Sequence, residues 1–212
     1  MTDGGYAEER DALVDSLVER GYVETDAVER AMRAVPREVF LPEDARGRVY
    51  KDSPLPIGEG QTVSAPHMVA MITERLDLSE GDRTLEVGTG RGYHAAVVAR
   101  TVGAENLYTV ERQEKLAVEA RQNLPEEVTV VVGDGSKGLA EEAPFDRIYL
   151  TCAAPDVPGF IDDQLREGGR CVLPAETGGA QRLVTVEKRD GETVVNEGEP
   201  VRFVRMYGEE GF

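Results

Sequence analysis

The sequence predicts an α/β fold with a parallel, doubly wound sheet. From Arg83 to Pro174, short apolar segments typical of strands alternate with segments whose apolar residues recur at helical spacing. A glycine-rich turn, "LEVGTGRGY" (residues 85–93), joins the first such strand to the first such helix. After Pro174 the helical patterns end, and we expect the remaining strands to extend the sheet in antiparallel fashion.

Two helices are predicted ahead of the sheet. Residues 8–21 carry Leu and Val at helical spacing and end in Gly21, and residues 25–36 begin at a Thr-Asp cap and stop at Pro36. Residues 40–60 are rich in Pro and Gly, which predicts an irregular connector.

An uncharged run follows this connector. It opens with "GQTVSAPHM" (residues 60–68) and has no charged side chain before Glu74, although 31% of the chain is charged. We expect a helix that enters the core with a polar start, and Ser64 is a candidate cap because Pro66 suits a first helical turn.

The alternating elements have definite expected ranges. Strands are predicted at residues 84–87, 106–110, 128–132, 147–151 and 169–174, with helices at 92–101, 114–124 and 158–165. The C-terminal strands are predicted at 181–189, 192–198 and 201–206, and Asp190-Gly191 is the turn between the first two.

Length and charge limit the organisation and the partners. We expect one domain over residues 1–212, with N-terminal helices and connector in 1–60, an α/β core in 61–174 and C-terminal strands in 175–212. A net charge of −17 opposes nucleic acid as a partner and suggests a halophile's surface. With no spanning apolar run or signal-peptide pattern, we expect a cytoplasmic protein that does not bind membranes. We also expect it to be a monomer.

Cysteine and histidine usage predicts no metal site. Cys152 and Cys171 lie in apolar, strand-like segments, where a thiol is usually inert packing. The two histidines, His67 and His94, are far apart in the sequence and have no ligand spacing around them.

Glycines and acids at successive strand ends predict a ligand pocket. Gly88, Gly90 and Gly92 allow close backbone approach, and Glu86 precedes them as a buried acid suited to a cationic group. Glu111 ends the second strand, where an acid accepts hydrogen bonds from ribose hydroxyls, and Asp134 follows the third. Together they indicate a site for an adenosine that carries a positively charged amino acid.

The chain resembles a known family along nearly its whole length, from about Leu13 to Tyr207. The matching segments are "VPREVFLPE", "PLPIGEGQTVSAPHMVAMITE", "LEVGTGRGY", "YTVER", "VGDGSKG", "APFDRIYLTCAAPDVP", "QLREGGRCVLP" and "VRFV". They resemble the S-adenosylmethionine-dependent methyltransferases with a Rossmann-like sheet and, more specifically, the protein-L-isoaspartate (D-aspartate) O-methyltransferase family. The resemblance implies methyl transfer to the free carboxylate of L-isoaspartyl residues in damaged proteins, which initiates repair, with D-aspartyl residues as a second candidate acceptor.

The resemblance also implies roles for individual residues. Ser64 would be the catalytic residue that holds the isoaspartyl carboxylates, with Thr62 and Val204 beside the substrate. His67 would be either a packed core residue or a donor to the substrate. For the donor, which becomes S-adenosylhomocysteine, Glu111 would hold the ribose and Asp134 with Gly135 the adenine. The glycine turn with Thr89 would hold the methionine portion. Arg91 stands where the family commonly has a small residue, and would contact the donor carboxylate or stand in solvent.

Other functions remain open at this point. A small-molecule methyltransferase, or a donor-binding homologue without catalysis, would keep Glu111 and Asp134. A nicotinamide-dependent oxidoreductase is opposed by the G-x-G-x-G spacing of the turn. An RNA methyltransferase is opposed by the net charge.

Overall fold

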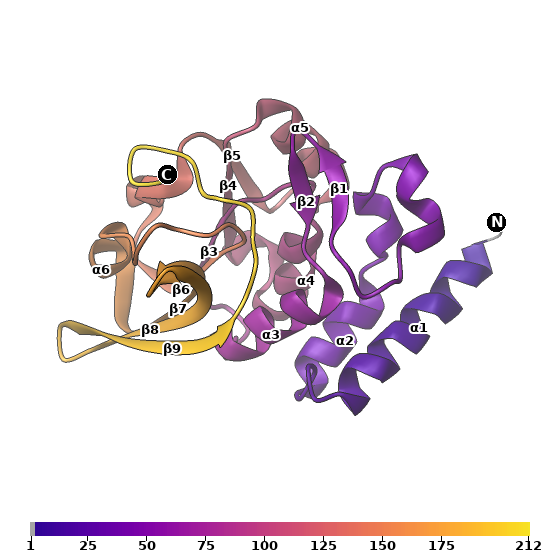
Figure 1. Ribbon diagram of the computed structural model, residues 1–212, viewed down its shortest axis with the longest axis horizontal. Coiled ribbons are helices and arrows are strands. Elements are labelled where there is room, and N and C mark those ends of the chain that lie inside the picture. Colours follow the sequence, from indigo (N-terminus) through magenta and orange to yellow (C-terminus); the bar gives the residue numbers. More distant parts are fainter. Residues whose placement is uncertain (1–2) are drawn as a thin grey trace.

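The computed structural model describes residues 3–212, and its N-terminal part is mostly helical (Figure 1). Two helices, two 3-10 helices, a short hairpin and a third helix precede the main sheet. In chain order they are α1 (Asp3–Glu19), α2 (Asp26–Ala34), Arg37–Phe40, Glu43–Arg48, β1 (Leu55–Gly58), β2 (Gln61–Val63) and α3 (Pro66–Leu76). The predicted helices are confirmed, whereas the connector is more ordered than expected, because the β1–β2 hairpin forms within and just after it.

The main sheet has seven strands. They are β3 (Thr84–Val87), β4 (Leu107–Glu111), β5 (Thr129–Val132), β6 (Phe145–Leu150), β7 (Leu165–Thr177), β8 (Ala180–Arg189) and β9 (Glu192–Pro200). Between them lie α4 (Tyr93–Val102), α5 (Glu114–Asn123), α6 (Phe160–Gln164) and the 3-10 helices Ala104–Asn106, Gly135–Lys137 and Ala140–Glu142.

The strand order is β5-β4-β3-β6-β7-β8-β9, with β3 to β7 parallel and β8 and β9 antiparallel. The chain moves outward from β3 to β5 and then returns to place β6 on the other side of β3. This reversal leaves a crevice at the carboxyl ends of β3 and β6, where open α/β sheets bind ligands. The predicted fold class is therefore confirmed.

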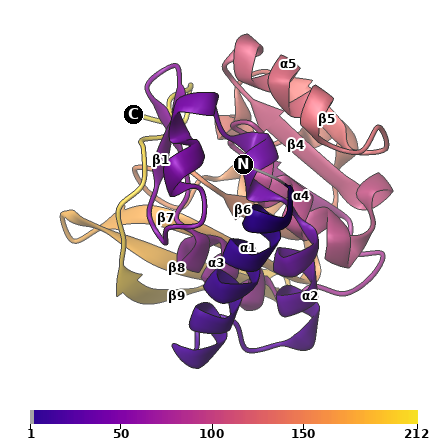
Figure 2. The same cartoon turned by 90° about the vertical axis from the view of Figure 1, so that its right-hand side faces the viewer.

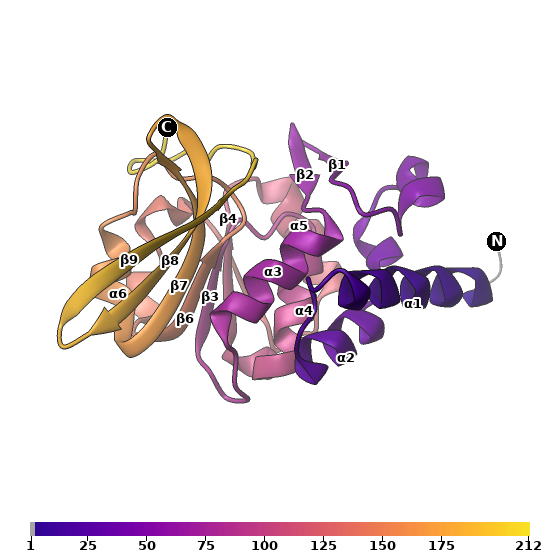
Figure 3. The ribbon, with the colours of Figure 1, turned by 60° about the horizontal axis from the view of Figure 1, so that its bottom comes forward.

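Alternation along the strands divides the core between the two faces of the sheet. On β6, Tyr149 packs into the larger cluster with helices α1 to α5, whereas Ile148 and Leu150 pack into the second cluster with α6. Figure 3 shows α3, α4 and α5 on one side of the sheet and α6 on the other. Helices α1 and α2 lie beyond α3 and α4, on the side away from the sheet, and Figure 2 views the molecule from that side. None of the helices within residues 3–212 combines the length and apolar character that crossing a bilayer demands.

The C-terminal strands follow the prediction only in part. Asp190 and Gly191 have positive φ values of 54° and 80° and form the predicted turn between β8 and β9. The expected strand at 201–206 is wrong. This segment is extended, but its only bridge is between Arg205 and Ala153, so it forms no ladder. It instead crosses the carboxyl ends of the strands, where it reaches the ligand crevice.

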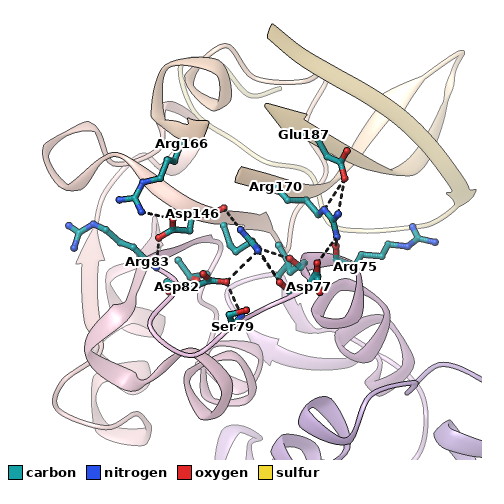
Figure 4. Close-up of polar contacts among 12 residues, drawn as sticks. Arg75, Asp77, Ser79, Asp82, Arg83, Asp146, Arg166, Arg170 and Glu187 are labelled. Carbon is teal, nitrogen blue, oxygen red and sulfur yellow. Dashed lines mark hydrogen bonds and ion pairs between the residues drawn. The ribbon is translucent and has the colours of Figure 1, made fainter. Parts of the chain in front are cut away.

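A polar network fixes the far end of α3 to the amino ends of the strands (Figure 4). Arg147 on β6 donates to the carbonyl oxygens of Leu76 (2.7 Å) and Asp77 (3.0 Å), at the end of α3. Arg170 on β7 donates to the Arg75 carbonyl oxygen (3.0 Å) and pairs with Glu187 (2.8 Å). These bonds satisfy the last carbonyls of the helix and therefore help to place its start at the other end.

Candidate active site

The glycine turn follows β3 and needs glycine for steric reasons. Gly88, Gly90 and Gly92 all have positive φ values, which side chains rarely adopt. A Cβ at Gly88 would lie 2.4 Å from Thr151 Oγ1, and a Cβ at Gly92 would lie 2.9 Å from Leu124 Cγ. Gly88 therefore lets β3 approach the end of β6, and Gly92 lets α4 begin against Leu124.

Glu111 lies at the end of β4 and fixes the turn. One carboxylate oxygen accepts from the Gly90 N–H (2.8 Å) and the other from the Gln113 N–H (2.8 Å). Burial raises the pKa of Glu111, while the N–H groups of Gln113, Gly90 and Arg112 oppose the rise. Because each oxygen has further lone pairs, Glu111 can still accept hydrogen bonds from a ligand.

A narrow cavity of about 80 Å³ occupies the crevice between β3, β4 and β6, and we call it the donor cavity. Four predicted donor-binding residues line it, namely Gly88, Gly90, Glu111 and Gly135. Its other wall comes from the C-terminal segment, through Val204, Arg205, Met206 and Tyr207.

Glu86 and Thr89 lie behind this cavity in a buried hydrogen-bonded chain. Thr109 Oγ1 lies 2.5 Å from a Glu86 carboxyl oxygen and 2.5 Å from Thr89 Oγ1, so the three side chains form one hydrogen-bonded chain. Burial raises the pKa of Glu86 to about 8. Both side chains line a small cavity of about 30 Å³ that shares Gly88, Gly90 and Thr151 with the donor cavity.

The Asp134 carboxylate accepts hydrogen bonds from two backbone N–H groups of the chain. One belongs to Ser136 (2.9 Å) and the other to Glu209 (2.8 Å) of the C-terminal segment. Among the described residues that line the donor cavity, Gly135 and Ser136 are present and Asp134 is not. Its role with the adenine stays a prediction.

A second cavity, of about 720 Å³, contains all four predicted substrate residues, and we call it the acceptor cavity. Thr62, Ser64, His67 and Val204 line it. Its apolar lining comes from Tyr22, Pro54, Met68, Met71, Val201 and Phe203. Thr62, Thr151 and Val204 line both the donor and the acceptor cavity, so the two meet at these residues.

The predicted capping role of Ser64 is wrong. Helix α3 begins at Pro66 and its N-cap is Ala65, with no capping bond from a side chain. Since Pro66 occupies the first helical position, the cap falls one residue after Ser64. The Ser64 side chain is therefore not required by the helix, although its carbonyl oxygen accepts from Arg37 (3.0 Å).

Arg37 is a buried residue that sequence reasoning missed. Its side chain is fully buried and donates to four backbone carbonyls, those of Val49, Lys51, Ser53 and Ser64. It thereby holds the segment that leads into the acceptor cavity. Only its place in "VPREVFLPE" could have drawn attention to it, because arginine is rarely fully buried.

The structure also shows the surroundings of Arg91, whose role toward the donor stays a prediction, and of the two cysteines. Arg91 forms an ion pair with Glu119 (2.9 Å). Cys152 lines the donor cavity and Cys171 is buried. Both are free thiols, and burial raises the pKa of Cys152 to about 12 and raises that of Cys171 as well. A raised pKa favours the protonated thiol near neutral pH.

Comparisons with known proteins agree with this architecture. Residues 8–211 match the model of the family Protein-L-isoaspartate(D-aspartate) O-methyltransferase (PCMT). Two curated relatives are named protein-L-isoaspartate O-methyltransferase. The one from Hyperthermus butylicus is 48% identical and covers 98% of this chain and 92% of its own. The one from Methanothermobacter thermautotrophicus is 49% identical and covers 97% and 98%.

A solved structure gives the same picture. It comes from Plasmodium falciparum and is described as a beta-aspartate methyltransferase (PCMT) in complex with S-adenosyl-L-homocysteine. It is 28% identical to this chain, with a TM-score of 0.84, and covers 93% of this chain and 98% of its own.

The fold and the crevice at its switch point define a Rossmann-like, S-adenosylmethionine-dependent methyltransferase. The residues present fit such a donor, because the Glu111 carboxylate borders the crevice and its oxygens can still accept hydrogen bonds from hydroxyl groups. Within this class, the chain belongs to the protein-L-isoaspartate(D-aspartate) O-methyltransferase family.

Proposed function

We propose that this protein transfers a methyl group from S-adenosylmethionine to the free carboxylate of L-isoaspartyl residues in damaged proteins and peptides, and so initiates their repair. The observation that carries the proposal is the meeting of the two cavities at Thr62, Thr151 and Val204. A donor on one side and an acceptor on the other would meet there, so that the acceptor carboxylate could reach the methyl group directly. The relatives' names favour this acceptor over a small molecule.

The chain needs only to position the reactants. S-adenosylmethionine supplies a methyl group bonded to a positively charged sulfur. The acceptor carboxylate is already ionised near neutral pH, so no side chain has to remove a proton. Holding the reacting atoms in line contributes a large part of the rate, and the apolar walls of the acceptor cavity strengthen the attraction between anion and cation.

In this proposal Ser64 donates its hydroxyl to the acceptor carboxylate, and Glu111 and Gly135 hold the donor. The monomeric state remains an expectation from the sequence. The cytoplasmic location, the halophilic source and the exclusion of nucleic acid remain expectations from the sequence.

Ser64→Ala is expected to lower kcat/KM for an isoaspartyl peptide by about 10- to 150-fold, because one hydrogen bond to an anion is lost. Donor affinity should stay unchanged, since Ser64 does not line the donor cavity. The unfolding temperature should also stay close to that of the wild type, because Ser64 does not cap α3.

The matched control is Ser79→Ala, which changes an exposed serine outside both cavities. A folded Ser64→Ala enzyme as active as Ser79→Ala would remove Ser64 from the acceptor site.

A further inference from the structure

An acidic residue next to the start of α3 joins three parts of the chain. Asp52 lies just before β1, and one of its oxygens accepts from the His67 backbone N–H (3.0 Å) and lies 2.8 Å from the same residue's ring Nδ1. The other oxygen accepts from Arg20, beyond the end of α1 (2.7 Å). Asp52 therefore satisfies an N–H of the helix start that no capping side chain reaches.

The protonation of Asp52 decides which nitrogen of His67 carries a proton. Burial favours the neutral carboxyl, but the hydrogen bonds from the His67 N–H, from Arg20 and from the His67 ring outweigh it and lower the pKa of Asp52. An ionised carboxylate can only accept hydrogen bonds. His67 Nδ1 must therefore carry a proton, and Nε2 is the nitrogen left for another partner.

The surroundings keep the ring at the acceptor cavity. Tyr22 packs against it, with ring centroids 5.3 Å apart, and the Arg20 guanidinium lies over the Tyr22 ring, 4.9 Å from its centroid. His67 and Tyr22 both line the acceptor cavity. The other charged groups that line it are Glu199 and Arg202, and Glu199 is already paired with Arg75 (2.5 Å).

We propose that Asp52 is a positioning residue, which turns the His67 ring so that Nε2 contacts the acceptor carboxylate. With Asp52 on one side and the acceptor carboxylate on the other, the ring is held as an imidazolium that donates from both nitrogens. Arg20 supports the arrangement by holding the second oxygen of Asp52. The inference rests on the proposed function, because it takes a carboxylate as the acceptor.

The arrangement also distinguishes the acceptor from the product. Methyl transfer forms a bond between the carboxylate oxygen and the methyl carbon and breaks the bond from that carbon to sulfur. The acceptor loses its negative charge and the sulfur its positive charge, while the His67 protons stay in place. The imidazolium thus attracts the acceptor but not the neutral ester, which favours release of the product.

Asp52→Asn is the main test, because asparagine keeps an acceptor oxygen for the His67 N–H while it removes the charge. KM for an isoaspartyl peptide is expected to rise about 5- to 20-fold at pH 7.5, with kcat within about threefold, because binding of the anion is what weakens.

A double-mutant cycle separates positioning from simple support of the helix. His67→Ala is expected to raise KM to a similar extent, and Asp52→Asn should add less than about twofold in that background, because residues that act through each other are not additive. Arg20→Ala should raise KM for the isoaspartyl peptide by a smaller factor. Asp15→Ala, which removes an exposed carboxylate of α1 away from both cavities, is the matched control. If KM of the double variant Asp52→Asn/His67→Ala rises by the product of the two separate increases, the proposal is overturned.

Nitrogen NMR of the ligand-free protein tests the arrangement without activity. The chain has only two histidines, and His94, buried on α4, is an internal reference. We expect a protonated Nδ1 on His67 in the wild type, loss of that preference in Asp52→Ala and unchanged His94 signals. Identical His67 signals in both proteins would overturn the proposal. A wild-type enzyme that fails to methylate isoaspartyl peptide would instead contradict the proposed function, while the NMR comparison would still decide whether Asp52 sets the ring.

Discussion

Arg37→Ala is expected to produce a large loss of stability, of about 2 to 4 kcal/mol in the free energy of unfolding. The change removes the common donor of four backbone carbonyls in the segment from Val49 to Ser64. Buried carbonyls without a partner are costly, and water can reach them only by loosening that segment. Thermal unfolding should show a fall in Tm of about 5 to 15 °C.

The matched control is Arg33→Ala, on the neighbouring helix α2. Arg33 pairs with three carboxylates, of Asp11, Asp15 and Glu29, but these pairs are at the surface, where ion pairs contribute about 0 to 1 kcal/mol. Arg37→Lys should recover only part of the stability, because one ammonium group cannot span the carbonyls that a guanidinium reaches. Equal stabilities of Arg37→Ala and Arg33→Ala would contradict the role assigned to the buried arginine.

Glu111→Ala is expected to weaken binding of S-adenosylhomocysteine by about 10- to 150-fold, or about 1.5 to 3 kcal/mol. The carboxylate that borders the donor cavity is lost, and the Gly90 N–H loses its acceptor, so the glycine turn also becomes less fixed. Isothermal titration calorimetry measures the change directly, without a peptide substrate.

Glu114→Ala provides the control for this change, because Glu114 is exposed at the start of α5 and does not line the donor cavity. Its affinity for S-adenosylhomocysteine should be that of the wild type. An equal affinity in Glu111→Ala would exclude Glu111 from the donor site.

The parallel part of the fold could be predicted because its signals are local. The strands that are buried on both faces are short apolar runs, and each is followed by a turn and a helix with its own periodicity. The Asp190-Gly191 turn was predictable for the same reason, since it depends on two adjacent residues. That residues 1–212 form a single domain stays a prediction.

The errors concern segments whose structure depends on distant partners. Residues 201–206 have the alternation of a strand, but β9 already ends in Pro200. After one backbone hydrogen bond from Val201 to Gln181 of β8, the segment leaves the sheet and forms its bridge with Ala153. The β1–β2 hairpin forms in a Pro- and Gly-rich stretch that Arg37 holds from another part of the chain. Neither the crossing nor the arginine leaves a periodic signal in the sequence.

The residues of the candidate site also divide into those that local sequence signals predict and those whose role depends on distant partners. Gly88, Gly90 and Glu111 could be predicted because strand ends in a parallel sheet meet at one edge. Ser64 and His67 were implied by the family resemblance, and they line the acceptor cavity. Asp52 and Thr151 were missed because their partners are distant in the sequence. Asp52 contacts His67, 15 positions away, and Thr151 donates to the Gly88 carbonyl oxygen, 63 positions away.

The most direct test of the account is transfer of labelled methyl from S-adenosylmethionine to two peptides that differ only in isoaspartate and aspartate at one position. The isoaspartyl peptide presents its free main-chain carboxylate to the acceptor cavity, and the proposed function predicts methylation of this peptide and little or none of the aspartyl peptide. Equal labelling of the two peptides, or donor binding with no labelling of either, would contradict it.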